Sequence, residues 1–329
     1  MNPLAQTAIR IDSYLGEGDE RSLAQDAREG LTRPLKELPP KHFYDARGAE
    51  LFDQICELPE YYPTRTERAI LNDTAAELAA VTGAVELVEL GSGTAAKTRV
   101  LLDALHAAGT LTRYVPVDVT EGMVRDCAQE LIEEYPGLRV HGVVGDFERH
   151  LDRVPDAAGP RLVVFLGGTI GNFPPSERRR FLAQIADLLG PEDHLLMGTD
   201  LVKDPEVLEA AYDDRQGVTA EFNRNLLHVL NRELDADFDP ADFEHVARFD
   251  AGNEWIEMRL RSRREHTVNV RALELPVHFA AGEEMRTEIS AKFTRERIDE
   301  DLAGAGLELV QWLTDPEEQF ALTLSAPAG

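Results

Sequence analysis

Two glycines, with an acidic residue shortly before them, stand between an apolar run and a helical pattern. The run at residues 85–90 is rich in branched apolar side chains, and Gly91-Ser92-Gly93 follows it; apolar residues then recur at helical spacing from about Ala95. Glycine lets the backbone turn sharply and approach a ligand closely, because it has no Cβ. The N-terminus of the next helix offers free N–H groups and a partial positive charge. This strand–turn–helix unit predicts a nucleotide-binding α/β fold.

The glycine spacing alone does not identify the nucleotide. Gly91, Gly93 and Ala96 fit the dinucleotide pattern G-x-G-x-x-G/A, which is a weak signal by itself. Glu89 stands just before the glycines, and an acidic residue there is more typical of S-adenosylmethionine (SAM) sites than of NAD sites. No pyrophosphate has to be bound at such a site, and a carboxylate suits the sulfonium and the amino group. The sequence therefore favours SAM.

Polar residues that could hold such a ligand follow the next strands. Asp118 ends the second predicted strand, where a carboxylate can accept both ribose hydroxyls. Asp146 and Phe147 end the third, where they could accept from the adenine amino group and pack on its ring. Lys97 falls in the first predicted turn of the glycine-loop helix, an unfavourable place for a cation, which suggests a role toward the methionine carboxylate. Each residue also has a plain alternative: a turn or capping aspartate, an ordinary turn phenylalanine, a solvated lysine.

Asn172 lies in the glycine-rich segment FLGGTIGNF that ends the fourth predicted strand. An asparagine side chain can both donate and accept, so it could hold an amine and a carboxylate together. An asparagine in a turn needs no such role, and the residue by itself leaves both interpretations open.

Strand and helix patterns alternate from residue 64 to 200, with strands expected at 85–90, 114–119, 140–144, 161–166 and 194–199. Residues 201–292 break this alternation, and residues 307–313 and 320–325 then form an expected antiparallel pair. Five parallel strands with a terminal hairpin are typical of the seven-stranded Rossmann-like sheet of class I SAM-dependent methyltransferases, whereas an NAD-binding sheet has a sixth parallel strand. We expect a SAM-binding domain at 64–200 plus 293–329. An inserted α+β substrate-binding domain is expected at 1–63 plus 201–292.

The amino-acid composition restricts the binding partners and the cell compartment that we expect for this protein. The chain has 329 residues and a net charge of -27, which argues against nucleic acids and anionic membranes as partners. No apolar run is long enough to span a bilayer, and the N-terminus lacks a signal-peptide pattern. The two cysteines, Cys56 and Cys127, fit buried thiols of a cytoplasmic protein, and the nine histidines show no metal-ligand spacing. The sequence has no apolar heptads, so we expect a monomer, and the histidine spacing leads us to expect no bound metal.

The chain resembles the L-histidine Nα-methyltransferases of ergothioneine biosynthesis over nearly its whole length. The segments that carry the resemblance are KHFYDARGAELFDQI (41–55), LPEYYPTR (58–65), VELGSGTAAKT (88–98), GDFE (145–148), FLGGTIGNF (165–173), GTDLVKD (198–204), AYDD (211–214), FNRNLL (222–227), ADFEHVARF (241–249) and GEEMRTEISAKF (282–293).

The resemblance implies SAM-dependent trimethylation of the α-amine of L-histidine, which gives hercynine. It places SAM-binding roles on Gly91, Lys97, Asp118, Asp146 and Phe147. It places the amino acid's backbone groups on Tyr61, Asn172 and Tyr212, and Tyr44 near the reacting amine, so that Tyr44 and Asn172 are the residues expected at the chemistry. It assigns Glu288 and Ser290 to the imidazole and Met258 beside that ring. Serine often stands where this chain has Gly168, which concerns a minor contact.

The residue types agree with that assignment. Glu288 and Ser290 are two apart on a predicted strand, so both point to one face, and a carboxylate plus a hydroxyl can bind the two nitrogens of an imidazole. Three alternatives remain open at this stage: an N-methyltransferase of another amino acid such as tryptophan or tyrosine, an NAD-dependent dehydrogenase, and a non-catalytic SAM-binding protein.

Overall fold

The computed structural model describes residues 8–15 and 23–329; residues 1–7 and 16–22 lie outside the described residues, and with them part of the N-terminal segment discussed above. The chain forms two compact units. Among the described residues, unit 1 contains 8–15, Thr66–Leu201 and Phe293–Gly329, and unit 2 contains 23–65 and Val202–Lys292.

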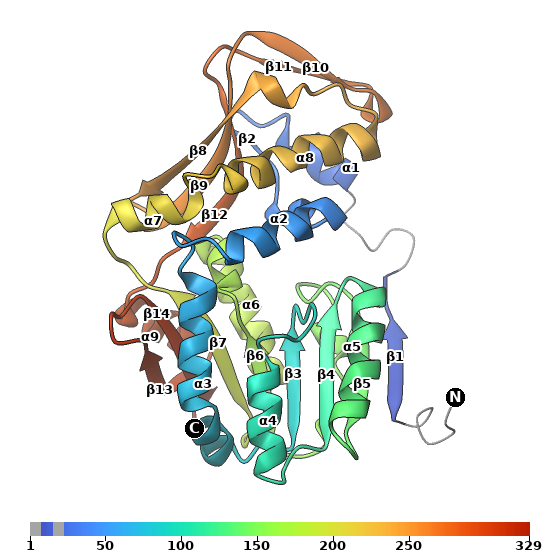
Figure 1. Cartoon of the computed structure of the whole chain (residues 1–329), viewed down its shortest axis with the longest axis vertical. Coiled ribbons are helices and arrows are strands. Elements are labelled where there is room, and N and C mark those ends of the chain that lie inside the picture. Colours follow the sequence, from blue (N-terminus) through green and yellow to red (C-terminus); the bar gives the residue numbers. More distant parts are fainter. Residues whose placement is uncertain (1–7, 16–22) are drawn as a thin grey trace. The chain divides into compact units, whose positions relative to one another are not determined.

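A mixed sheet forms the centre of unit 1 (Figure 1). Its order among the described residues is β1-β5-β4-β3-β6-β7-β14-β13. Every pair from β1 to β7 is parallel, while β14 is antiparallel to both β7 and β13. The strands are β1 (Ile9–Ser13), β3 (Glu86–Leu90), β4 (Arg113–Asp118), β5 (Arg139–Val144), β6 (Arg161–Phe165), β7 (His194–Asp200), β13 (Leu307–Thr314) and β14 (Phe320–Pro327). This is the expected class I methyltransferase sheet, with the terminal hairpin in place.

One strand in this sheet was not expected. β1 extends the sheet by pairing parallel with β5, from Ile9 opposite Val140 to Ser13 opposite Val144. We had counted residues 1–63 with the other domain, and β1 departs from that assignment. A five-residue edge strand draws its hydrogen bonds from a distant partner, so its own residues carry little signal.

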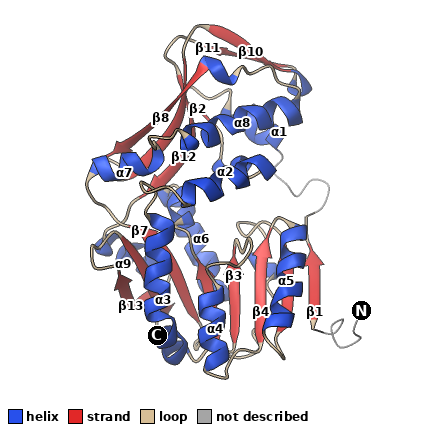
Figure 2. Cartoon of the chain, viewed as in Figure 1, coloured by secondary structure: helices blue, strands red, loops and turns tan. Residues whose placement is uncertain are grey.

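Helices cover the sheet of unit 1, and α3 and α4 run in front of the strands in Figure 1. The helices are α3 (Pro63–Thr82), α4 (Arg99–Ala107), α5 (Glu121–Glu134), α6 (Pro175–Leu188) and α9 (Arg295–Gly304), with short 3₁₀ helices η2 (Leu151–Arg153) and η3 (Thr169–Asn172). Figure 2 shows how helices and strands alternate in this unit. All residues of β3 and β6 are buried, as expected for interior parallel strands covered on both faces.

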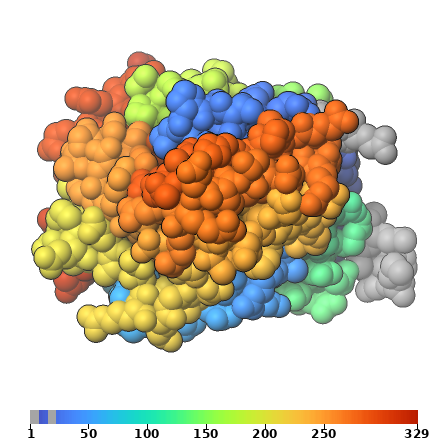
Figure 3. Space-filling view, turned by 90° about the horizontal axis from the view of Figure 1, so that it is seen from above, coloured from blue at the N-terminus to red at the C-terminus, as the bar shows by residue number. Residues whose placement is uncertain are grey.

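Unit 2 combines two sheets with helices around one hydrophobic core. The four-stranded sheet has the order β2-β12-β9-β8, and β10 pairs with β11. The strands are β2 (Lys36–Glu37), β8 (Phe243–Asp250), β9 (Trp255–Ser262), β10 (His266–Val270), β11 (Leu275–Phe279) and β12 (Glu284–Ala291). The helices are α1 (Leu23–Gly30), α2 (Ala46–Cys56), α7 (Pro205–Tyr212), α8 (Val218–Leu234) and the 3₁₀ helices η1 (Pro40–Phe43), η4 (Pro240–Asp242) and η5 (Arg271–Leu273). In the space-filling view of Figure 3, the orange atoms belong to the segment of this unit that contains β8 to β12 and the turns between these strands.

A β-bulge in β12 decides which side chains face which way. Arg286 lies opposite Arg259 of β9, but Glu288 lies opposite Met258, so Thr287 is an extra residue on β12. Without this bulge, residues 284, 286, 288 and 290 would share one face. With it, Glu288 and Ser290 take the face of Met258 and Ile256, whereas Glu284 and Arg286 join a network of ion pairs with arginines and Glu257 on the other face.

None of the helices in the described part of the chain is both long enough and apolar enough to cross a membrane. Both cysteines are free thiols; Cys127 is buried, as expected, while Cys56 is only half-buried.

Candidate functional site

The glycine turn after β3 is shaped by left-handed residues. Gly91 and Gly93 have φ angles of 75° and 49°, and Ala95 has a φ of 54°. Ala95 therefore cannot be helical, and α4 begins only at Arg99. The expected helix start near Ala95 is wrong, and Lys97 lies in the turn before the helix rather than in its first turn.

Asp118 holds this turn from the end of β4. One oxygen of its carboxylate accepts from the Gly93 N–H at 2.9 Å, and the other accepts from the Thr120 N–H at 2.9 Å. A carboxylate has about four acceptor positions, so Asp118 keeps capacity for ligand hydroxyls. The turn also leaves a polar atom to be satisfied, because buried Ser92 Oγ has no hydrogen-bond partner among the described residues. These features fit a polar ligand such as SAM at the turn.

The other expected cofactor residues lie at the end of β5. The ring of Phe147 packs against Phe165 and Phe181, with centroids 5.4 Å and 5.7 Å away. A Cβ placed on Gly91 would lie 3.5 Å from the Phe147 ring, so the glycine turn and this aromatic side chain are neighbours. Asp146 accepts from the Glu148 N–H at 2.9 Å, which shapes its own turn. The structure thus brings Phe147 close to the glycine turn at Gly91.

Lys97 has a partner that the sequence analysis missed. Its Nζ lies 2.7 Å from Glu67 Oε2, while Glu67 Oε1 accepts from the Gly167 N–H at 2.7 Å. Glu67 is fully buried on α3. Because a buried carboxylate is costly unless it is paired, a glutamate among the apolar residues of a predicted helix was the available signal. Glu67 ties the glycine-loop turn to the loop after β6.

Glu89 is buried, and its carboxylate contacts the hydroxyls of Thr98 and Tyr114. Burial raises the pKa of Glu89 to about 7, and the nearby charge of Asp118 acts in the same direction, while the two hydroxyls oppose it. Glu89 therefore belongs to an internal network behind the glycine turn, where both of its oxygens already have partners in the protein.

In unit 2, three of the expected substrate residues are tyrosines near one another. Tyr61 and Tyr212 are buried, with ring centroids 6.2 Å apart, and Phe52 lies 6.1 Å from Tyr61 and 5.5 Å from Tyr44. Burial raises the pKa of Tyr61 well above its usual value, and the charges around Tyr61, including that of Glu288, act in the same direction.

Tyr44 differs in exposure, since 54% of its surface is open to solvent. Desolvation of the buried part of the side chain raises the pKa of Tyr44. The charge of Glu288 raises this pKa further. The two effects have the same sign, so Tyr44 stays a neutral phenol near neutral pH.

A second missed residue, Lys292, joins Tyr212 and Ser290. Tyr212 Oη donates to Ser290 Oγ at 2.8 Å, and Lys292 Nζ donates to Ser290 Oγ at 2.9 Å and to Tyr212 Oη at 3.1 Å. Lys292 is fully buried, and its Nζ lies 4.7 Å from the centroid of the Tyr212 ring. Its place near the end of a strand expected at 285–293, in an otherwise apolar A-K-F, was the only signal in the sequence.

Glu288 and Met258 form a cross-strand pair between β12 and β9, and Met258 is buried. Most of the residues expected at the substrate belong to unit 2, namely Tyr44, Tyr61, Tyr212, Met258, Glu288 and Ser290. Asn172 belongs instead to unit 1, at the end of η3, as do the residues expected to bind SAM. The 3₁₀ helix begins after Gly168, whose φ of 68° is one that serine adopts only with strain.

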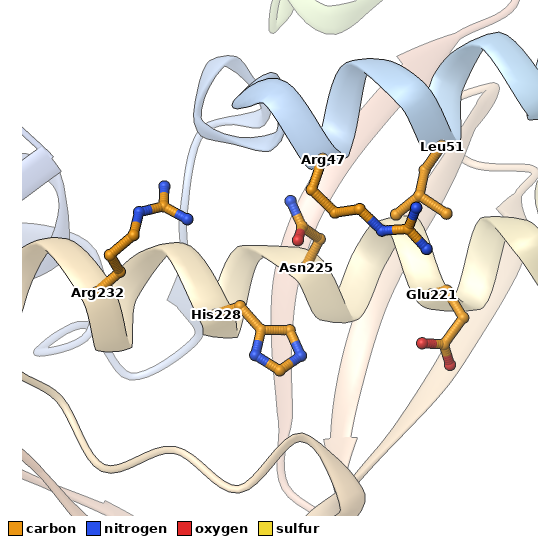
Figure 4. A pocket seen from close by; sticks show the side chains of 6 residues that line it. All are labelled: Arg47, Leu51, Glu221, Asn225, His228 and Arg232. Carbon is orange, nitrogen blue, oxygen red and sulfur yellow. The ribbon is translucent and has the colours of Figure 1, made fainter.

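A separate open pocket of unit 2 contains none of these residues. It has a volume of about 400 Å³ and lies between α2 and α8, lined by Arg47, Leu51, Glu221, Asn225, His228 and Arg232 (Figure 4). Arg232 is paired with Asp45, to which Asn225 also donates. Arg232 and Asn225 thus stabilise the start of α2 through Asp45. Within residues 8–15 and 23–329, His, Cys, Asp and Glu side chains form no group of three or more that could hold a metal ion.

The strand order of unit 1, with β14 inserted antiparallel beside β7, and the polar glycine turn at β3 together define a class I SAM-dependent methyltransferase. The model of one family, described as "Histidine-specific methyltransferase, SAM-dependent", matches residues 23–327. The chain belongs to this family.

Curated relatives agree with this assignment. The "Histidine N-alpha-methyltransferase" of Mycolicibacterium smegmatis is 56% identical over 318 residues, covering 96% of this chain and 99% of the relative. The protein of the same name from Mycobacterium tuberculosis is 51% identical, covering 97% and 99%. "Ergothioneine biosynthesis protein 1" of Neurospora crassa is 36% identical over 201 residues, which are 60% of this chain and 23% of that protein.

Proposed function

We infer that this protein transfers methyl groups from SAM to the α-amine of L-histidine. The observation that carries the substrate is the face of β12 and β9 in unit 2, where Glu288 and Ser290 lie on the same side as Met258. A carboxylate, a hydroxyl and a flat apolar contact suit an imidazole. A site built for two such hydrogen bonds disfavours tryptophan or tyrosine, because each has a single polar group on its ring system and would leave one of the two partners unpaired.

We assign Gly91, Lys97, Asp118, Asp146 and Phe147 to SAM. The turn of Gly91 brings backbone close to the ligand, Asp118 accepts ribose hydroxyls, and Asp146 and Phe147 hold the adenine. Lys97 pairs with the methionine carboxylate while it keeps Glu67, since an ammonium has three donor hydrogens. SAM supplies a methyl group on an electrophilic sulfonium.

Tyr61, Asn172 and Tyr212 are assigned to the backbone groups of histidine, and Tyr44 with Asn172 to the orientation of its amine. The raised pKa values of Tyr44 and Tyr61 keep both phenols protonated, so neither acts as a phenolate base. The enzyme's contribution is then alignment of the amine lone pair and exclusion of water, worth on the order of 7 kcal/mol or more. The amine loses its proton to water or through a tyrosine oxygen.

Three transfers to one nitrogen give Nα,Nα,Nα-trimethyl-L-histidine (hercynine), and the pathway served is ergothioneine biosynthesis. The names of the mycobacterial and Neurospora relatives support this place in metabolism. The trimethylammonium product has no N–H, so it cannot keep the hydrogen bonds that held the amine.

We further propose that the protein acts as a monomer in the cytoplasm, without nucleic-acid or membrane partners. The net charge of -27 supports this, because so acidic a surface repels phosphate backbones and anionic lipid.

Mass spectrometry of a reaction with SAM and an equimolar mixture of the twenty amino acids tests the function. We expect histidine alone to gain methyl groups, up to three. Methylation of a different amino acid would overturn the assignment of Glu288 and Ser290, and a single added methyl group would overturn the trimethylation alone.

A further inference from the structure

Lys292 is a fully buried cation among the residues proposed to recognise the substrate. It ends unit 2, directly after β12. Its Nζ contacts Ser290 Oγ at 2.9 Å and Tyr212 Oη at 3.1 Å. Burying an ammonium costs free energy even when hydrogen bonds compensate part of it, so its effect on these two hydroxyls is of interest.

The chemistry of the ammonium fixes the direction of two of the three hydrogen bonds, and the structure gives the third. An ammonium can only donate, so both hydroxyl oxygens accept from Lys292. Tyr212 Oη donates its own hydrogen to Ser290 Oγ at 2.8 Å. The Ser290 oxygen thus accepts two hydrogen bonds, which occupy both of its lone pairs. Its remaining capacity is its hydrogen, so toward any further partner Ser290 is a donor.

Glu288 has the opposite polarity on the same face of β12. An ionised carboxylate can only accept, so Glu288 and Ser290 together offer one acceptor and one donor. A neutral imidazole offers the complement, one N–H and one bare nitrogen. An imidazolium carries two N–H groups, and one of them would face the hydrogen of Ser290.

We propose that Lys292 is a positioning residue that fixes the Ser290 hydroxyl as a donor, so that the site selects histidine with a neutral imidazole ring. This inference rests on the proposed function and adds the protonation state of the bound substrate.

Other titratable groups pack around this cluster from several elements. They are Tyr44 after η1, Cys56 on α2, Tyr61 before α3, Asp213 after α7, His245 on β8, and Glu288 itself. The two tyrosines are kept neutral by their raised pKa values, and burial lowers the pKa of His245. A change of charge on any of these groups acts on every ligand in the site, whereas titration of the ring acts only on a ligand whose ring titrates.

Calorimetric measurement of ligand binding in the presence of S-adenosylhomocysteine separates titration of the protein's groups from titration of the bound ring. The ligands are L-histidine and its 1,2,4-triazol-3-yl analogue, whose ring has an N–H and bare nitrogens but stays neutral between about pH 5.5 and about pH 8. We expect the affinity for histidine, relative to the analogue, to fall about tenfold for each pH unit below about 6.5, where imidazole gains a proton. A ratio that is constant across this range would overturn the inference, while the absence of histidine binding at any pH would overturn the proposed function and the inference together.

Lys292→Met and Lys292→Arg test the role of the cation. In Lys292→Met the Ser290 oxygen regains a lone pair and can accept from an imidazolium N–H, so we expect the affinity for histidine, relative to the analogue, to fall clearly less than about tenfold per pH unit below about 6.5. Arginine keeps a donor and should restore the pH dependence. An unchanged pH dependence in Lys292→Met would contradict the role of Lys292. If this variant does not fold, the comparison of the two ligands on the unmodified protein still decides whether the ring is bound neutral.

Discussion

The ion pair of Lys97 with Glu67 shows how one buried carboxylate constrains a residue that we propose to bind SAM. Glu67 has no exposed surface, and its two oxygens are used by Lys97 and by the Gly167 N–H. Lys97 itself keeps a quarter of its side chain exposed. The pair therefore leaves the ammonium reachable for a ligand while Glu67 depends on it for charge compensation.

Variants of this ion pair should differ in their free energy of unfolding. Lys97→Met leaves the Glu67 charge buried without its cation, and we expect a loss of about 2 to 3 kcal/mol in the free energy of unfolding, less than for a fully buried pair. Adding Glu67→Gln to that variant removes the buried charge but keeps an acceptor for Gly167, so stability should recover in part. Denaturant unfolding of the two single variants and the double variant measures this coupling. Additive effects would show that the pair is not coupled.

Residue types and motifs were enough to propose the site residues but not to predict their internal partners. Asp118 and Phe147 carry recognisable chemistry at strand ends, where an α/β fold places ligand-binding groups. Glu67 and Lys292 stand out in the sequence as charged residues in apolar surroundings, but their contacts with residues 30 and 80 positions away follow from no local pattern. The same holds for Glu89, whose hydroxyl partners come from a later turn and from the neighbouring strand.

At the scale of elements, the bulge in β12 is the feature that the strand pattern could not reveal. Polar residues alternate regularly at positions 284, 286, 288 and 290, as in an undistorted strand with one polar face. The pairing with β9 instead splits them, since Glu288 and Ser290 face the Met258 side and Glu284 and Arg286 face the ion-pair network. The alternating strands and helices of unit 1 were predictable, because their periodicity is local; β1 and the bulge were not.

Thr287 holds the bulge, because its fully buried hydroxyl donates to the Met258 carbonyl at 3.0 Å. Thr287→Val keeps the shape but removes this bond, and we expect a loss of about 1 to 3 kcal/mol in the free energy of unfolding. Since the bulge aims Glu288 and Ser290, the KM for histidine should rise several-fold while the KM for SAM stays near its original value. Steady-state kinetics with each substrate varied in turn measures both constants.

Thr287→Ser is the matched control, because it retains the hydroxyl, and it should leave the KM for histidine close to that of the unmodified protein. An equal rise of both KM values in Thr287→Val would indicate a general loss of folded protein, and an unchanged KM for histidine would show that the bulge does not depend on this bond.

For the whole molecule, the pH dependence of stability combines groups with opposite signs. Burial alone would raise the pKa of Asp214, but hydrogen bonds from the backbone N–H groups of Thr219 and Val218 outweigh it and lower the pKa. Asp214 therefore contributes stability above its unfolded pKa of 3.8, which is lost only as the pH falls below that value. Burial lowers the pKa values of His194 and His245, so they cost stability as the pH falls through 6.5, where the unfolded chain binds the proton first.

Glu89 affects the pH dependence of stability in the opposite direction, because its contribution falls as the pH rises from 4.5 to about 7. Burial raises its pKa from 4.5 to about 7, so the folded protein holds the proton more tightly than the unfolded chain does. Its contribution to stability is complete below pH 4.5 and is lost as the pH rises to about 7, at a rate of up to about 1.4 kcal/mol per pH unit.

Glu89→Gln isolates this contribution, because glutamine does not titrate and every other group remains in both proteins. Without SAM, we expect the free energy of unfolding of the variant, relative to the unmodified protein, to increase by about 2 kcal/mol between about pH 5 and about pH 8. Lost hydrogen-bond geometry with Thr98 or Tyr114 would shift the variant's stability equally at both pH values, so it does not affect this difference. Denaturant unfolding across the range measures it, and parallel curves for the two proteins would show that Glu89 is already ionised in the folded state at pH 5.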